Sequence, residues 1–250
     1  MAPELKGRGI LWVHSRVSPS VRGVLSEDAF LKWYDEEHIA EVVTTGGIHN
    51  ALRYVNVNKG SSSVSKPNLV IYPLEDIAFT GSKRFQEIGV TLDVAGEERV
   101  VYDVADFDII CMSLVKKTEA KNKKGTAQYV LASALEPASE TSDEVVTKFY
   151  EQQTATVSKA PNYLRTLRFR LVFGRTNGQS RAWKGLPVNE DEPVIEPISW
   201  LAVHEFSAEP SQDVQDDAKK DVGDVLRKAK QNELHVYSLV KEFGGGALFD

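Results

Sequence analysis

His38 is the residue of this chain whose type and position best suit proton transfer. It ends the segment FLKWYDEEH at residues 30–38, where Tyr34 stands four residues earlier and therefore on the same face of a predicted helix. An imidazole titrates near neutral pH, which suits removal of a proton from an acidic carbon or a phenol. A hydrogen-bonded core histidine is the alternative interpretation.

His14 is a second candidate, on a predicted strand. By the period of two, it shares a face with Ile10 and Trp12. If that face lines an apolar interior, burial would lower the pKa of His14. A core histidine whose ring nitrogens are hydrogen-bonded is again the alternative.

Further side chains could bind a substrate next to a catalytic group formed by His38, His14 and Tyr34. Tyrosine hydroxyls could hold a carbonyl or phenol oxygen, and an arginine could bind a carboxylate or an enolate. The alternative role of the aromatic residues is packing. Arg53 has a counterpart in Arg168, so its alternative role is a structural ion pair, with Glu37 or Glu151 as the acid. The predicted substrate-binding residues are Trp12, Trp33, Arg53, Tyr72 and Tyr102.

Motifs for a metal or a cofactor are not found, and the sequence predicts neither. The acids at 35–37 precede His38 on consecutive helix positions, which point in different directions, and no second histidine follows four residues later. The glycines at 244–246 follow a predicted strand but open no helix. Cys111 is the only cysteine and lies in an apolar run, so we expect a small buried hydrophobic residue.

The composition is that of a globular chain of 250 residues with a net charge of −6. Negative charge removes the usual electrostatic support for nucleic-acid binding. No segment is apolar over the length of a membrane span, and the N-terminal residues contain no long apolar run. We therefore expect a cytoplasmic protein that binds neither nucleic acid nor membrane.

A long repeat indicates which elements hold the candidate residues. The segment 30–38, followed by Arg53-Tyr54, recurs 116 residues later as 146–154, followed by Arg168-Phe169. Such a period suits a small domain duplicated in tandem. Without gaps, the repeat matches His38 with Thr154, which suggests one working site and one scaffold. The predicted domains are 1–117 and 127–250, joined by a linker at 118–126.

Each copy has the order β-α-β-β-α-β of a ferredoxin-like unit. Such a unit covers one sheet face with helices, so two units can pack their open faces together. The prediction is an α+β chain in which two tandem units form one barrel. An insertion at 175–197 is expected as a surface loop or a lid. The expected strands are 10–17, 51–57, 68–72, 107–115, 128–135, 164–173, 200–206 and 234–242, and the expected helices are 27–44, 75–88, 143–159 and 212–230.

The segment WYDEEHI at 33–39, followed by Arg53-Tyr54, resembles the dimeric α/β-barrel superfamily, and in particular its EthD-like branch, common in fungal chains. The stretch 148–171 resembles the same pattern. The resemblance implies a fused barrel and a His38 near a cleft between helices and sheet. Members include polyketide cyclases, decarboxylases, isomerases, cofactor-independent monooxygenases and haem enzymes, so the fold does not fix the activity.

Two hypotheses follow. The first is a cofactor-independent enzyme of secondary metabolism, in which His38 carries out acid/base chemistry on a hydrophobic polyketide or phenol. Cyclisation, isomerisation, dehydration and decarboxylation all fit, and cofactor-free monooxygenation is an alternative. The second is a non-catalytic ligand-binding or stress-type barrel protein. A pocket of roughly several hundred Å³ with convergent polar groups would favour the enzyme, and a barrel filled solid by side chains would favour the binding protein. A monomer would be sufficient, and a homodimer is compatible with the pattern.

Overall fold

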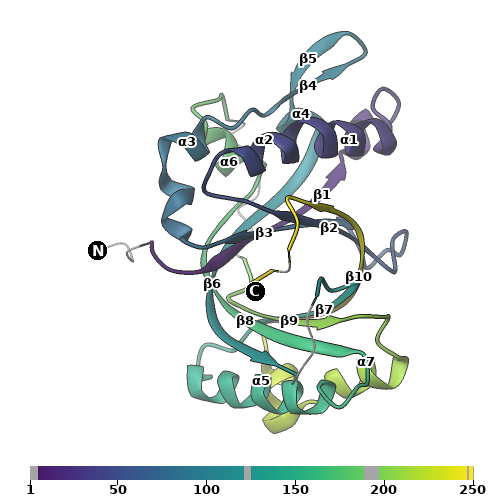
Figure 1. Cartoon of the computed structure of the whole chain (residues 1–250), viewed down its shortest axis with the longest axis vertical. Coiled ribbons are helices and arrows are strands. Elements are labelled where there is room, and N and C mark those ends of the chain that lie inside the picture. Colours follow the sequence, from purple (N-terminus) through teal and green to yellow (C-terminus); the bar gives the residue numbers. More distant parts are fainter. Residues whose placement is uncertain (1–4, 121–124, 189–196, 247, 250) are drawn as a thin grey trace.

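The computed structural model describes residues 5–120, 125–188, 197–246 and 248–249. Eight antiparallel strands close into a barrel in the order β1-β3-β2-β10-β7-β9-β8-β6 (Figure 1). In chain order they are β1 (Gly9–Val17), β2 (Ala51–Asn56), β3 (Asn68–Leu74), β6 (Ala105–Glu119), β7 (Tyr129–Glu136), β8 (Tyr163–Arg175), β9 (Trp200–Phe206) and β10 (Gln231–Phe243).

Both halves of the barrel have the same strand order. The N-terminal half gives β6-β1-β3-β2 and the C-terminal half gives β10-β7-β9-β8, joined by the pairs β2–β10 and β6–β8. The predicted fold, two tandem ferredoxin-like units closing one barrel within a chain, is confirmed. β6 continues to Glu119, into the predicted linker at 118–126, and pairs there with β8. Residues 121–124 of that linker lie outside the described residues. The division into domains 1–117 and 127–250 stays a prediction.

Side chains alternate between the barrel interior and the helices along each strand. On β1, Ile10 and Trp12 belong to the interior cluster, whereas Leu11 and Val13 pack under the helices of the N-terminal half. His14 is on the interior side, in contact with Trp12, as the period of two predicts. The sheet therefore separates the two histidines that the sequence placed in one catalytic group.

One long helix covers the N-terminal sheet and another the C-terminal sheet (Figure 1). The first comprises α1 (Glu27–Trp33), the π-helical η2 (Tyr34–His38) and α2 (Ile39–Thr44). Ser26 begins it, because its side chain accepts a hydrogen bond from the Ala29 amide. The second, α5 (Asp143–Val157), is a regular α-helix over its whole length.

Each of the two other predicted helices is broken into short pieces. In the N-terminal half, Ser82 ends η3 (Ile77–Gly81) and caps α3 (Lys83–Gln86). The hairpin of β4 (Thr91–Val94) and β5 (Glu97–Val100) and the short α4 (Val101–Val104) follow, none of which the sequence predicted. In the C-terminal half, Gly223 has a φ of 73° and interrupts the helical path. The pieces there are α7 (Gln212–Ala218), η4 (Val222–Asp224) and α8 (Val225–Lys228), and a further short helix, η1 (Pro19–Val21), follows β1.

The insertion contains a helix, α6 (Asn177–Trp183), that packs against the opposite half of the molecule. It contacts α4, and Trp183 at its end packs against Phe85 of α3, although α6 follows β8 in the chain (Figure 1). The Asn177 side chain donates to the carbonyls of Tyr102 and Ala105 and accepts from the Phe107 amide. Of the two expectations for 175–197, the described part therefore fits a lid; residues 189–196 lie outside the described residues. No helix in the described ranges has the length and hydrophobicity needed to cross a membrane.

Candidate active site

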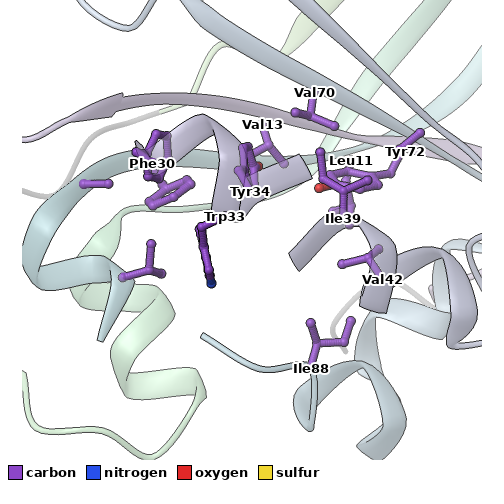
Figure 2. Packing of buried hydrophobic residues seen from close by; sticks show 14 of the residues in the cluster. Leu11, Val13, Phe30, Trp33, Tyr34, Ile39, Val42, Val70, Tyr72 and Ile88 are labelled. Atoms are coloured by element: carbon purple, nitrogen blue, oxygen red, sulfur yellow. The ribbon is translucent and has the colours of Figure 1, made fainter. Parts of the chain in front are cut away.

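A cleft opens in the N-terminal half between the long helix, the outer face of the sheet and α6. It has a volume of about 80 Å³, and we call it the His38 cleft. Figure 2 shows Tyr34 and Ile39 on the helix facing Leu11, Val13 and Tyr72 on the strands. Four of the predicted site residues, His38, Tyr34, Tyr72 and Tyr102, meet here. The lining residues are Leu11, Val13, Tyr34, His38, Val42, Tyr72, Phe85, Ile88, Val90, Val101, Tyr102, Phe107, Ile109, Arg175, Ser180, Trp183 and Lys184.

The π-helical turn η2 brings His38 to the cleft. Such a turn accommodates one extra residue in a helix and is frequent at functional sites. The sequence carries the trace of that insertion. Tyr34 and Tyr150 lie 116 residues apart, whereas Arg53 and Arg168 lie 115 apart, so one residue has been gained between them in the N-terminal half.

His38 therefore corresponds to Gln153, and the gapless match with Thr154 was wrong. The burial pattern agrees with the new register. Ile39 and Thr154 are both buried, as matched positions on the sheet-facing side of each helix should be. A gapless comparison could not place a bulge that has no sequence motif of its own.

The strand pairing defines a second pair of matched positions. On β3, the residue opposite Arg53 is Val70, and Tyr72 lies two residues further on. In the C-terminal half, the residue of β9 opposite Arg168 is Ala202, and His204 lies two residues further on. The N-terminal half thus carries His and Tyr where the C-terminal half carries Gln and His.

His38 is half-buried, and a single hydrogen bond fixes its orientation. Its Nδ1 lies 3.0 Å from the Gly89 carbonyl oxygen, so Nδ1 carries the proton and Nε2 is left unprotonated. The ring stacks against both Trp33 and Tyr34, with centroids 5.3 and 5.4 Å away. Burial lowers the pKa of His38 to about 4, which the Gly89 hydrogen bond partly offsets and Lys184 reinforces. The imidazole is therefore neutral at pH 7.

Three tyrosine hydroxyls surround the cleft as hydrogen-bond donors. Burial raises the pKa of Tyr34, Tyr72 and Tyr102, the last to about 12, so all three keep their protons near neutral pH. The Tyr72 hydroxyl is fully buried and has no partner in hydrogen-bond geometry among the described residues. It lies near enough to Tyr34 to lower the pKa of that ring.

The insertion adds four lining residues that the sequence analysis did not select. Arg175 stacks over the rings of Phe173 and Trp183, 4.5 and 4.2 Å from their centroids. Lys184 donates to the backbone carbonyls of Gln86 and Ile88, and burial lowers its pKa to about 8. Ser180 is buried and lies close to Tyr102. The run RAWK at 181–184, basic and aromatic in an otherwise polar insertion, was the available signal.

Arg53 lies outside the His38 cleft, in a buried ion pair. Its guanidinium donates to both oxygens of Asp35, at 2.6 and 2.9 Å. The structural interpretation of Arg53 is thus supported, although the expected acid, Glu37, is wrong. Arg168 has the predicted partner Glu151, at 3.8 Å.

Trp12 and His14 lie on the other side of the sheet. They line a separate hollow of about 130 Å³ at the mouth of the barrel, whose interior is otherwise packed with apolar side chains. The His14 Nε2 lies 3.0 Å from the Tyr237 hydroxyl, and burial lowers its pKa to about 4. Trp33 stacks on His38 without lining the cleft. The predicted site residues therefore form two groups, and His14 cannot reach a ligand that contacts His38.

In the C-terminal half, the matched residues bond to each other. The His204 Nε2 donates to the Gln153 Oε1 at 2.9 Å, and the Thr166 hydroxyl lies 2.8 Å from its Nδ1. The Gln153 amide nitrogen donates to the Ser133 hydroxyl and the Ala218 carbonyl. An open hollow of about 420 Å³ lies beside Gln153, but its lining does not include His204. Burial lowers the pKa of His204 to about 3.

Metal ligands and a reactive thiol do not come together in the described parts of the chain. No group of three His, Cys, Asp or Glu side chains is close enough there to hold a metal ion. Cys111 is buried, and burial raises the pKa of its thiol to about 12. The prediction of a small buried hydrophobic residue at this position is confirmed.

Comparisons with known proteins agree with this architecture. An anthrone oxidase-like protein superposes with a TM-score of 0.55 at 10% identity, over 97% of this chain and 94% of that chain. The chain has the dimeric α/β-barrel fold. A candidate monooxygenase of Fusobacterium nucleatum subsp. nucleatum ATCC 25586 gives 0.52 at 10% identity, over 96% of both chains.

A sequence relative comes from a secondary-metabolite cluster. Core atranone cluster (CAC) protein 1 of Stachybotrys chlorohalonatus (strain IBT 40285) is 27% identical over 195 residues, which are 77% of this chain and 80% of that protein. No family model matches the chain.

Proposed function

We propose that this protein is a cofactor-independent enzyme of secondary metabolism that removes a proton from a hydrophobic, oxygenated small molecule in the His38 cleft. The observation that carries the proposal is the orientation of His38. The hydrogen bond to Gly89 holds the proton on Nδ1, which leaves Nε2 as a base on a ring that lines the cleft. General bases are commonly held by a second group in this way.

The low pKa of His38 adds a requirement to the mechanism. At about 4, it keeps the ring neutral at pH 7 but makes it a weak base. Proton transfer from a phenol or an activated carbon therefore needs stabilisation of the negative charge left on the substrate. The Tyr34 and Tyr72 hydroxyls, which stay protonated, supply hydrogen-bond donors for that charge.

The His38 cleft holds about 80 Å³, less than the roughly several hundred Å³ that would favour an enzyme, and the packed barrel interior by itself favours a ligand-binding protein. The proposed enzyme therefore requires α6 to move before a substrate can enter. The contacts of α6 with the N-terminal half include the hydrogen bonds of Asn177 and the Arg181–Asp103 ion pair, which water can replace when the helix lifts. Closure of α6 would then exclude water from the reacting groups.

The sequence relative, named as a core protein of the atranone cluster, supports a role in secondary metabolism. The polyketide or phenolic substrate and membership of the EthD-like branch are parts of the same proposal. Cyclisation, isomerisation, dehydration and decarboxylation all begin or end with a proton transfer of this kind. The barrel closes within one chain, so a monomer is the proposed working unit.

Cofactor-free monooxygenation is the second candidate. It is favoured by the likeness of the barrel to an anthrone oxidase-like protein and a candidate monooxygenase. The first step would be the same, because an electron-rich substrate carbanion can itself react with oxygen. Oxygen consumption during turnover separates the two reactions. A non-catalytic ligand-binding protein would retain the cleft and show no turnover.

The test begins with deletion of the gene in its native host, where the unused substrate should accumulate. The accumulated compound is then given to the purified protein, and its turnover is measured. We expect His38→Ala to reduce turnover by about 100-fold or more, the usual contribution of a general base. Gln153→Ala, at the matched position, is the control and should act like wild type. Turnover of His38→Ala within about threefold of wild type would refute the proton-transfer role.

A further inference from the structure

The described lining of the His38 cleft includes Arg175 and Lys184 but no aspartate or glutamate. Glu41, outside that lining, partly offsets the charge of Lys184, whereas no described carboxylate does so for Arg175. The chain as a whole has a net charge of −6, so this local excess of cations runs against the overall composition. Burying an uncompensated cation is costly, and an anionic ligand would supply the missing charge.

Arg175 is half-buried and differs from the three buried arginines of the described chain. Arg53, Arg165 and Arg168 each have a carboxylate within ion-pair distance, in Asp35, Glu205 and Glu151 respectively. In the described part of the chain, Arg175 makes stacking contacts with two aromatic rings and no ion pair. Stacking fixes the plane of a guanidinium and leaves its N–H groups available at the edge.

Two buried hydroxyls in the same cleft lack a partner in hydrogen-bond geometry among the described residues. They are Tyr72 Oη and Ser180 Oγ, whose residues are 3% and 2% exposed. Each interacts with a tyrosine, Tyr34 and Tyr102 respectively, and lowers the pKa of that tyrosine. A buried hydroxyl without a well-formed hydrogen bond is destabilising, so a ligand oxygen at this point would be stabilised.

We infer that the His38 cleft binds its ligand as an anion, with Arg175 and Lys184 holding an acidic oxygen and the Tyr72 and Ser180 hydroxyls donating to the same ligand. The ligand class is a hydrophobic molecule that carries a carboxylate, a phenolate or an enolate. The inference rests on the proposed function only for the choice of this cleft. It also supplies the charge stabilisation that His38, as a weak base, requires.

The test uses benzoate and benzyl alcohol, which share a ring and differ in charge. In calorimetric titrations of the full chain at pH 7, benzoate should bind about tenfold or more tightly than the alcohol, because a hydrogen bond to a charged group contributes roughly 1.5–3 kcal/mol. Arg175→Gln should remove most of this preference, and Lys184→Met should reduce it. Arg84→Gln replaces an exposed arginine outside the cleft and should leave the preference unchanged.

A second variant separates charge from packing, because Arg175 also supports two aromatic rings. Arg175→Lys keeps the charge and should retain part of the preference for benzoate. The pH dependence gives an independent readout. Lys184, which faces Glu41, Arg175 and His38, loses its charge as the pH rises through about 8. Benzoate affinity should therefore fall above that pH in wild type and stay flatter in Lys184→Met.

Equal affinities of wild type for benzoate and benzyl alcohol would overturn the inference, and so would an unchanged preference in folded Arg175→Gln. The proposed function fails separately. If His38→Ala retains full turnover while the benzoate preference persists, the anion site stands and the catalytic role of His38 falls. If His38→Ala loses turnover while wild type shows no preference for benzoate, the catalytic role of His38 stands and the anion site falls.

Discussion

At matched positions, the N-terminal half of the barrel carries His38 and Tyr72, whereas the C-terminal half carries Gln153 and His204. In the C-terminal half the two side chains bond to each other, and each polar atom of the pair has a partner. In the N-terminal half they flank a cleft, and His38 is held through its Nδ1. Among the described residues, the Tyr72 hydroxyl has no partner in hydrogen-bond geometry. A histidine occurs in both halves, but its surroundings differ.

The difference teaches how one fold can serve as both scaffold and site. A saturated polar network stabilises a buried region, whereas unsatisfied donors reduce stability and prepare the region for a ligand. One inserted residue, accommodated by the π-helical turn η2, carries His38 to its position. The C-terminal half contributes α6, which completes the opposite wall of the cleft.

The largest expected effect concerns the two matched ion pairs. Arg53→Met would leave Asp35 buried without its bidentate partner and should reduce the free energy of unfolding by about 3–5 kcal/mol. We expect a loss at the lower end of this range, because Lys241 Nζ lies 3.4 Å from Asp35 and still pairs with its carboxylate. Arg168→Met should cost about 1 kcal/mol, because its acid is half exposed and stays hydrated. Urea unfolding measures both; equal losses would contradict the difference in burial.

The next effect separates the two polar sites. Gln153→Ala removes the partner of the His204 Nε2, the Ser133 hydroxyl and the Ala218 carbonyl. It should reduce the free energy of unfolding by about 2–4 kcal/mol while turnover is retained. His38→Ala removes one hydrogen bond and should cost about 1 kcal/mol while turnover is lost. Chemical denaturation and steady-state assays on the same preparations provide the comparison. A large stability loss in His38→Ala would assign it a structural role.

The smallest expected effect comes from one buried tyrosine hydroxyl in each half, which differ in whether they are hydrogen-bonded. Tyr150 donates to the Ser133 carbonyl at 3.1 Å, so Tyr150→Phe should destabilise the protein by about 1 kcal/mol. Tyr72→Phe removes a hydroxyl without a partner and should change the free energy of unfolding by less than about 0.5 kcal/mol, or increase it. The melting temperature of Tyr150→Phe should therefore be lower than that of Tyr72→Phe. A clear loss in Tyr72→Phe would show that its hydroxyl is already satisfied.

The barrel was predictable from the sequence because its signals are periodic. Alternation along β1 correctly separated Trp12 and His14 from the helix-facing positions, and Ser26 marked the helix start. The repeat indicated two matched units. These features depend on local residue types, which a single sequence displays directly.

The site was less predictable because it depends on contacts between distant segments. Arg175 and Lys184 come from an insertion of the other half, about 140 residues or more after His38 in the chain, and the strand register that matches Tyr72 with His204 is a property of pairing. The placement of His14 with His38 failed for a related reason. Both are reactive residue types, but only the fold shows that a sheet lies between them.

Nitrogen-15 NMR of the histidine rings is the most direct test that the working base lies in the N-terminal half. Because both pKa values are lowered from 6.5, to about 4 for His38 and about 3 for His204, both rings should stay neutral down to about pH 5. Their share of stability is present above pH 6.5 and is lost as the pH falls towards those values. We expect His38 protonated at Nδ1, His204 protonated at Nε2, and benzoate shifting the His38 signals alone. A His38 ring protonated at Nε2, or a response from His204 instead, would contradict the account.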